Sequence, residues 1–142
     1  MIAIQTGEIR LCHSDFVLHS HTSPQEVEMC MANAIVRQDD SGTGYRHYML
    51  WLDIDPHEYV YAVLAFFHEC LQYVEILPQN HTDSVEDRKL SCMELDGARE
   101  KVLDWYKTRF SEAKMRFPWG EVSCYEGSDP IYSPPKILIQ YF

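Results

Sequence analysis

The sequence predicts an α+β fold in which an antiparallel sheet packs against two or three helices, with a central helix over about 56–77. The first observation behind this prediction is size, because 142 residues, 46% of them apolar and 13% aromatic, suffice for one globular domain over 1–142 with a substantial core. The second is that runs with strand-like composition alternate with runs of helical spacing. The third is that no repeat, low-complexity tract or linker divides the chain.

Short strands are expected at the start of the chain. The β-prone runs 9–12 and 16–19 predict a hairpin or two separate strands. Ser23-Pro24-Gln25-Glu26 then forms a capping box with proline at the first helical position, which predicts a helix start. Apolar spacing favours a helix over 24–37, but part of this segment also alternates, so a long strand pairing with 45–54 stays open.

The middle of the chain carries the best strand and the longest predicted helix. After a polar loop, residues 45–54 are rich in aromatic and branched side chains, as strands are. Asp55-Pro56-His57-Glu58 is a second capping box, and the helix it opens should end before Pro78. Apolar residues cover about half of the circumference of this helix, so we expect it at the centre of the domain. Its remaining arc is polar and mostly acidic, comprising His57, Glu58, Tyr61, Ala65, His68, Glu69, Gln72 and Glu75.

Four segments complete the chain. Residues 79–92 are polar and predict a loop, and the spacing of 95–117 predicts an amphipathic helix. A short strand is expected at 120–125. The terminal run 136–142 has strong β propensity, and either an edge or an internal place in the sheet suits it.

Overall composition excludes several functions. With 22 acidic and 12 basic residues the net charge is −10, so neither nucleic acid nor an anionic membrane is an expected partner. The N-terminus lacks the pattern of a secretion signal, and the longest apolar run, 60–67, is too short to span a bilayer, which predicts a cytoplasmic protein. Five widely spaced cysteines without a C-x-x-C pair predict reduced thiols.

Catalytic and metal-binding motifs are the next consideration. His-Glu occurs at His57 and His68, but zinc peptidases need a second histidine one turn later, and here those positions are Tyr61 and Gln72. Glycine-rich phosphate loops and the G-x-S-x-G motif are also missing. The sequence therefore predicts no catalytic residue, no cofactor and no metal.

One metal-binding alternative stays open. His19 and His21 would lie on one side of an extended chain and could ligate an ion.

The position of the charge is more informative than its total. The 41 residues between Arg46 and Arg88 contain eight acidic residues and no lysine or arginine. Aromatic residues lie among these acids, a combination that suits a protein interface, where rings anchor and charges steer encounter. We therefore expect the polar face of the 56–77 helix and the acids near its start to bind a basic protein. The predicted contact residues are Asp39, Asp40, Asp53, Asp55, Glu58, Tyr61, Glu69 and Gln72.

In size, acidity, aromatic content, cytoplasmic character and lack of catalytic motifs, the chain resembles small bacterial immunity proteins. Such proteins neutralise a toxin domain, often a basic nuclease, through an acidic surface. The resemblance covers the overall profile of the whole chain and includes no shared motif. The predicted contact residues are therefore chosen from the positions of the acidic residues in the sequence. It implies inhibition in trans, in which the acidic helix face would cover the active site or substrate groove of the toxin.

Two other function classes remain as alternatives. The first is a small enzyme or metal-binding protein that uses His19, His21, His57 or His68 with a neighbouring cysteine or carboxylate. The second is a subunit of a larger assembly. The sequence leaves the oligomeric state open.

Overall fold

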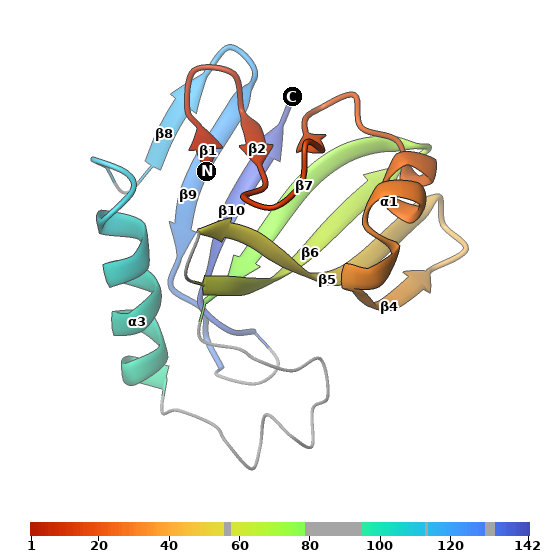
Figure 1. Cartoon of the computed structure of the whole chain (residues 1–142). Helices are drawn as coiled ribbons and strands as arrows, with labels where there is room; N and C mark the ends of the chain where they lie inside the picture. The colour runs from red at the N-terminus through yellow and green to blue at the C-terminus, as the bar shows by residue number, and fades with distance from the viewer. Residues whose placement is uncertain (56–57, 79–94, 113, 130–132) are drawn as a thin grey trace.

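The computed structural model describes residues 1–55, 58–78, 95–112, 114–129 and 133–142, and Figure 1 shows their arrangement. The chain forms a seven-stranded sheet with strand order β4-β5-β6-β7-β10-β9-β8 and a small sheet with order β1-β2-β3. Neighbouring strands pair antiparallel throughout. The elements are β1 (Ile2–Ala3), β2 (Glu8–Arg10), β3 (Val17–Leu18), α1 (Pro24–Cys30), the 3-10 helix η1 (Ala32–Ala34), β4 (Ile35–Asp40), β5 (Tyr45–Asp55), β6 (Glu58–Phe67), β7 (Cys70–Leu77), α3 (Leu95–Lys107), β8 (Lys114–Phe117), β9 (Gly120–Tyr125) and β10 (Lys136–Tyr141).

The predicted antiparallel sheet with packed helices is confirmed, and strands dominate the described chain. The predicted central helix over 56–77 is wrong, because this segment forms β6 and β7, two neighbouring strands of the large sheet. The apolar residues of β6 form an almost continuous run, which is the pattern of a strand buried on both faces and cannot be told from a buried helix by periodicity. Asp55 and Glu58, which look like a helix cap in the sequence, are instead the final pair of the antiparallel ladder between β5 and β6.

The turn between β6 and β7 carries no sequence signal that would predict it. His68 and Glu69 connect β6 to β7, and both have positive φ, 48° and 70°. A two-residue hairpin loop with two positive φ values normally carries Asn-Gly or a similar pair. His-Glu does not match that pattern. The backbone N–H of His68 donates to the carbonyl of Gly44 at 3.1 Å, which ties the turn to the neighbouring loop.

Both alternatives for 24–37 hold in part. The capping box forms as predicted, since Ser23 Oγ accepts a hydrogen bond from the Glu26 N–H at 3.2 Å and Pro24 is the first helical residue. The helix ends at Cys30, however, and from Ile35 the chain becomes β4, which pairs with β5.

The other predicted elements have mixed outcomes. The N-terminal strands, the strand near 45–54 and the strand at 120–125 are confirmed. The helix predicted over 95–117 ends at Lys107, and its last four residues form β8. The strand predicted at 136–142 is β10, which lies inside the sheet between β7 and β9. The loop predicted at 79–92 lies outside the described residues.

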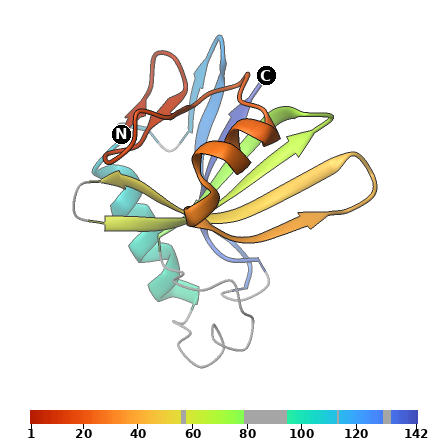
Figure 2. The ribbon, with the colours of Figure 1, turned by 45° about the vertical axis from the view of Figure 1, so that its right-hand side comes forward.

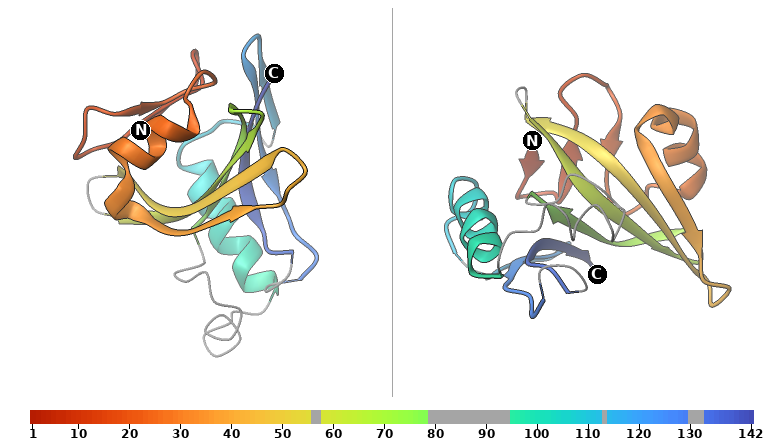
Figure 3. Two further views of the ribbon diagram at one scale, coloured as in Figure 1. Left: turned by 90° about the vertical axis from the view of Figure 1, so that its right-hand side faces the viewer. Right: turned by 90° about the horizontal axis from the view of Figure 1, so that it is seen from below.

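The core lies on one face of the large sheet. Alternate residues of β5 and β6, such as Leu50 and Leu64, are fully buried on this face. The segments that cover it are α1, α3 and the small sheet, and the left panel of Figure 3 shows them on the same side of β8–β10. Their buried contacts include Ile9, Leu18, Val27, Val102, Tyr106 and Phe110.

The sheet twists strongly from one edge to the other. In Figure 2, β4 and β5 run across the direction of β8–β10. The N-terminal segment is fixed along the end of β5, where the N–H of Cys12 donates to the Asp53 carbonyl at 2.8 Å and the α-amino group of Met1 donates to the Ile54 carbonyl at 2.9 Å. None of the helices in the described ranges has the length and apolar character needed to cross a lipid bilayer.

Candidate functional site

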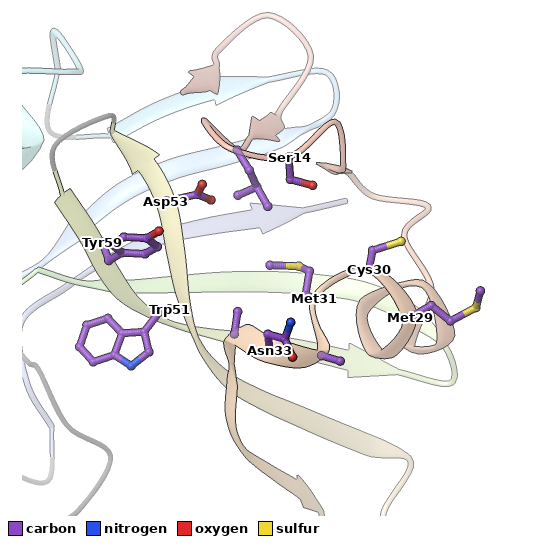
Figure 4. A pocket seen from close by; sticks show the side chains of 11 residues that line it. Ser14, Met29, Cys30, Met31, Asn33, Trp51, Asp53 and Tyr59 are labelled. Atoms are coloured by element: carbon purple, nitrogen blue, oxygen red, sulfur yellow. The ribbon is translucent and has the colours of Figure 1, made fainter.

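An open groove of about 760 Å³ lies beside β5, between that strand, the start of the chain and the end of α1 (Figure 4). We call it the β5 groove. It is lined by Leu11, Ser14, Met29, Cys30, Met31, Ala32, Asn33, Ala34, Trp51, Asp53 and Tyr59. Within the described part of the chain, the lining residues include one carboxylate, two methionines and two large aromatic side chains, and no lysine or arginine.

One wall of the β5 groove comes from the end of α1 and from η1. α1 has 7 residues and ends at Cys30, and η1 begins two residues later at Ala32. Met29 and Met31, on either side of the helix end, have opposite environments. Met31 is 5% exposed and packs into the core, which fixes this wall to the protein. Met29 is 83% exposed and points away from the core, leaving a flexible apolar side chain at the rim.

The opposite wall comes from β5 and β6. Trp51 projects from one face of the sheet, and Asp53 lies two residues further along β5, where the pairing with β6 shifts register between Leu52 and Asp55. Trp51 pairs with Tyr61 across the ladder, with ring centroids 5.4 Å apart at 73°. Tyr59 precedes Tyr61 by two residues on β6, so it projects from this face as well, and it is 59% exposed. Figure 4 shows Asp53, Tyr59 and Trp51 along this wall, with Met31 and Cys30 across the groove.

Asp53 is the best-defined polar group of the site. The residue is 8% exposed, and its Oδ2 accepts two hydrogen bonds from His13, one from the backbone N–H and one from ring Nδ1, each 2.9 Å long. Among the described residues, none donates a hydrogen bond to its Oδ1. One oxygen therefore anchors the N-terminal segment, while the other keeps its acceptor capacity among the described contacts.

The pairing of His13 with Asp53 is not predicted by the sequence. The two residues are 40 positions apart, and they meet because the N-terminal segment crosses the end of β5. His13 lies in an irregular segment without periodicity, so nothing in the sequence links it to a carboxylate. Asp53 itself was among the predicted contact residues, although it was expected near the start of a helix.

The predicted contact residues separate to the two ends of the β5–β6 hairpin. Asp53, Asp55 and Glu58 belong to one end, although the side chains of Asp55 and Glu58 lie outside the described part. Glu69 belongs to the other end, because Tyr45 pairs with Phe67 there. Ten residues of strand span roughly 33 Å, so the predicted acidic face is not continuous.

At the second end, the acids already have partners. Asp39 accepts a 2.9 Å contact from Arg37, and Asp40 lies 3.8 Å from Arg46. Glu69 accepts a hydrogen bond from Gln25 of α1 at 3.3 Å. These pairs lie at the surface, where they contribute little to stability and reduce the net negative charge available to a partner.

Two of the predicted contact residues lie in β6 and β7, away from the groove. Tyr61 was expected to be exposed but is 3% exposed, packed against Trp51 on the sheet face. Gln72 occupies a bulge in β7, since Ala65 pairs with Tyr73 and Phe66 with Leu71. Neither side chain lines the β5 groove.

The histidines of the metal-binding alternative form a small local cluster. The rings of His19 and His21 lie 6.2 Å apart, and His19 Nδ1 accepts a hydrogen bond from the backbone N–H of His21 at 3.1 Å. In the ranges that the structure describes, no group of three or more His, Cys, Asp or Glu side chains is placed to hold an ion. Of the other two histidines in that alternative, His57 lies outside the described residues and His68 occupies the β6–β7 turn.

Comparison with protein-family models, curated proteins and solved structures found no match. Within the described residues, the β5 groove combines a volume of about 760 Å³, exposed apolar side chains and a partly buried carboxylate.

Proposed function

We propose that this chain binds and neutralises a basic protein, as immunity proteins do with their toxins, and that the β5 groove is its contact site. The observation that carries the proposal is the lining of the groove. Exposed Met29 and Tyr59 flank the partly buried Asp53, and no lysine or arginine is among the lining residues that the structure describes. This proposal replaces the acidic helix face with a concave surface at one end of the β5–β6 hairpin.

The physical argument has two parts. Aromatic residues and methionine are enriched in the centres of protein interfaces because they bury much apolar area and adapt their shape. A net charge of −10 accelerates encounter with a basic partner, and a carboxylate within the groove fixes the orientation of the bound segment. Neutralisation then follows if the segment seated in the groove belongs to the partner's active site or substrate channel.

The test is co-expression with the product of the gene adjacent to its own. We expect the neighbouring product to arrest growth when it is expressed alone, and this chain to restore growth and to co-elute with it on size exclusion. A neighbour that is harmless, or that forms no complex with this chain, would refute the neutralising function.

Positive charges introduced into the groove test whether it is the contact surface. Met29→Lys with Tyr59→Lys places two positive charges at positions that are 83% and 59% exposed, so the fold should tolerate them. We expect binding to weaken at least about tenfold and growth rescue to be lost, because like charges then face each other. The matched control is Tyr125→Lys, a tyrosine on β9 that is 45% exposed and does not line the groove. Equal effects of control and groove variants would exclude the groove as the contact site.

A further inference from the structure

We infer that the β5 groove contains a subsite for the guanidinium group of an arginine side chain, formed by Asp53 together with the aromatic rings of Tyr59 and Trp51. The inference rests on the proposed function, because it names the side chain of the basic partner that the groove receives. It also makes a separate claim about binding chemistry, which small probes can test without any partner.

The carboxylate supplies the charge of the subsite. Asp53 is 8% exposed, and water solvates it less than it solvates a surface acid, so a cation that reaches it interacts more strongly. Oδ2 already accepts two hydrogen bonds from His13. The lone pairs of Oδ1 are the acceptors that remain among the described contacts, and they suit an N–H donor from a ligand.

The aromatic side chains favour guanidinium over other donors. Tyr59 is 59% exposed, and with Trp51 it lines the same wall as Asp53. Guanidinium is planar and weakly hydrated, so it stacks on aromatic rings while its edge donates to a carboxylate. The chain itself contains such a stack, since Arg109 Cζ lies 3.8 Å from the centroid of the Trp105 ring.

Charge complementarity identifies a cation as the occupant. Among the described residues that line the groove, none is lysine or arginine, whereas the acids at the other end of the hairpin, Asp39 and Asp40, are paired with Arg37 and Arg46. Asp53 has a histidine as its partner instead, and this contact uses one oxygen only. An anionic ligand would meet the carboxylate, and none of the described lining side chains is a cation that could offset the repulsion.

The test is NMR titration with the peptide Ac-Gly-Arg-Gly-NH2, using protein labelled at methionine methyls and at indole N–H. We expect the signals of Met29, Met31 and Trp51 to shift on titration, and those of Met115 and Trp105 to stay in place. The same peptide with citrulline, which keeps the shape and lacks the charge, should bind at least about tenfold more weakly. Equal binding of the two peptides, or shifts outside the groove only, would overturn the inference.

Variants separate the roles of the carboxylate and the ring. Asp53→Asn should abolish the preference for arginine over citrulline. Tyr59→Ala should weaken arginine binding at least about threefold, and it keeps the test valid if Asp53→Asn fails to fold, because Tyr59 is exposed. Its matched control is Tyr45→Ala, an exposed tyrosine at the other end of the same hairpin, which should leave binding unchanged. Retained selectivity in a folded Asp53→Asn variant, or equal effects of the two tyrosine variants, would contradict the assignment.

The two proposals fail in different ways. If the chain neutralises its partner and the arginine peptide does not bind, the function stands and the arginine subsite is rejected. If the peptide binds at the groove and no neighbouring product is neutralised, the subsite stands and the immunity-type function is rejected.

Discussion

His68 and Glu69 show how much a fold can depend on two backbone conformations. Both residues have positive φ, a region that costs an ordinary L-residue roughly 1 kcal/mol relative to glycine. The hairpin forms nevertheless, because β6 and β7 bury apolar side chains such as Leu64 and Val74 on the core face. A locally unfavourable turn is therefore imposed by the packing of the strands on either side of it.

Glu69→Gly should stabilise the protein. Glycine removes the steric cost at φ 70°, and the side chain lost is exposed and makes one hydrogen bond to Gln25, so we expect a gain of about 0.5–1 kcal/mol in the free energy of unfolding. Urea denaturation measures this change.

The matched control for that prediction is Gly42→Ala. Gly42 has φ 72° in an open loop with no atom near an added Cβ, so alanine there should destabilise by a similar amount. A loss of stability in Glu69→Gly would show that the positive φ is not the controlling factor.

At the scale of elements, residue composition predicts a strand correctly where a single β-prone run is bounded by polar or turn residues. The runs at 45–54, 120–125 and 136–142 became β5, β9 and β10 because aromatic and branched residues fit a pleated surface in any context. The prediction of a helix over 56–77 is wrong for two reasons. A buried helix and a buried strand share a continuous apolar pattern, and the turn residues His68 and Glu69 include no glycine or asparagine that would indicate a hairpin. The local pattern therefore predicts one helix where the structure has the two strands β6 and β7.

Two substitutions in β6 distinguish strand from helix experimentally. A helix would place Ala65 on the polar arc and Tyr59 on the apolar arc, whereas in the structure Ala65 is fully buried and Tyr59 is 59% exposed. Ala65→Glu should therefore cost about 3 kcal/mol or more, since it buries an unpaired charge. Tyr59→Ser should cost less than about 1 kcal/mol. Thermal or urea unfolding followed by circular dichroism measures both, and the reverse order of effects would contradict the hairpin.

The site was harder to predict than the elements. Asp53 was identified from charge, since it lies in the long stretch without cations, but its partner His13 and the opposite wall at Met29 and Met31 come from distant positions. A groove forms where three segments meet, and such meetings depend on tertiary packing that no local pattern encodes. The sequence therefore predicts Asp53 as a member of the site but does not predict the groove around it.

At the scale of the whole molecule, buried tyrosine hydroxyls join the sheet to its covering segments. Tyr48 donates to Glu28 of α1 at 2.7 Å, and Tyr141 donates to the Gly7 carbonyl at 2.9 Å. Burial, together with the Glu28 hydrogen bond, raises the pKa of Tyr48 to about 12. Burial also raises the pKa of Tyr106 to about 12 and shifts that of Tyr141 upward. All three hydroxyls therefore favour the protonated state in the folded protein.

Stability should consequently fall in alkaline solution. The unfolded pKa of tyrosine is about 10, below the folded values, so the stabilising contribution is complete below pH of about 10 and is lost as the pH rises toward 12. We expect the urea midpoint to be constant just below this window and to decrease within it.

Tyr106→Phe is the matched variant for the alkaline prediction. It removes one titrating group whose hydroxyl makes a single long hydrogen bond of 3.5 Å, so its alkaline decrease should be shallower than that of the parent protein. Parallel decreases in the two proteins would show that other groups control the alkaline transition.

The place of β10 has a consequence for how the molecule folds. Residues 136–141 lie between β7 and β9 and join the β4–β7 part of the sheet to the β9–β8 part, although β7 precedes β10 by about 60 residues in the chain. During synthesis, β7 therefore emerges well before β10, and its pairing on that side has to wait until residues 136–141 have been made. We expect the pairing of β7 with β10 to be a late, slow step, and the edge of β7 that β10 covers to be the surface that a chaperone would need to protect in the meantime.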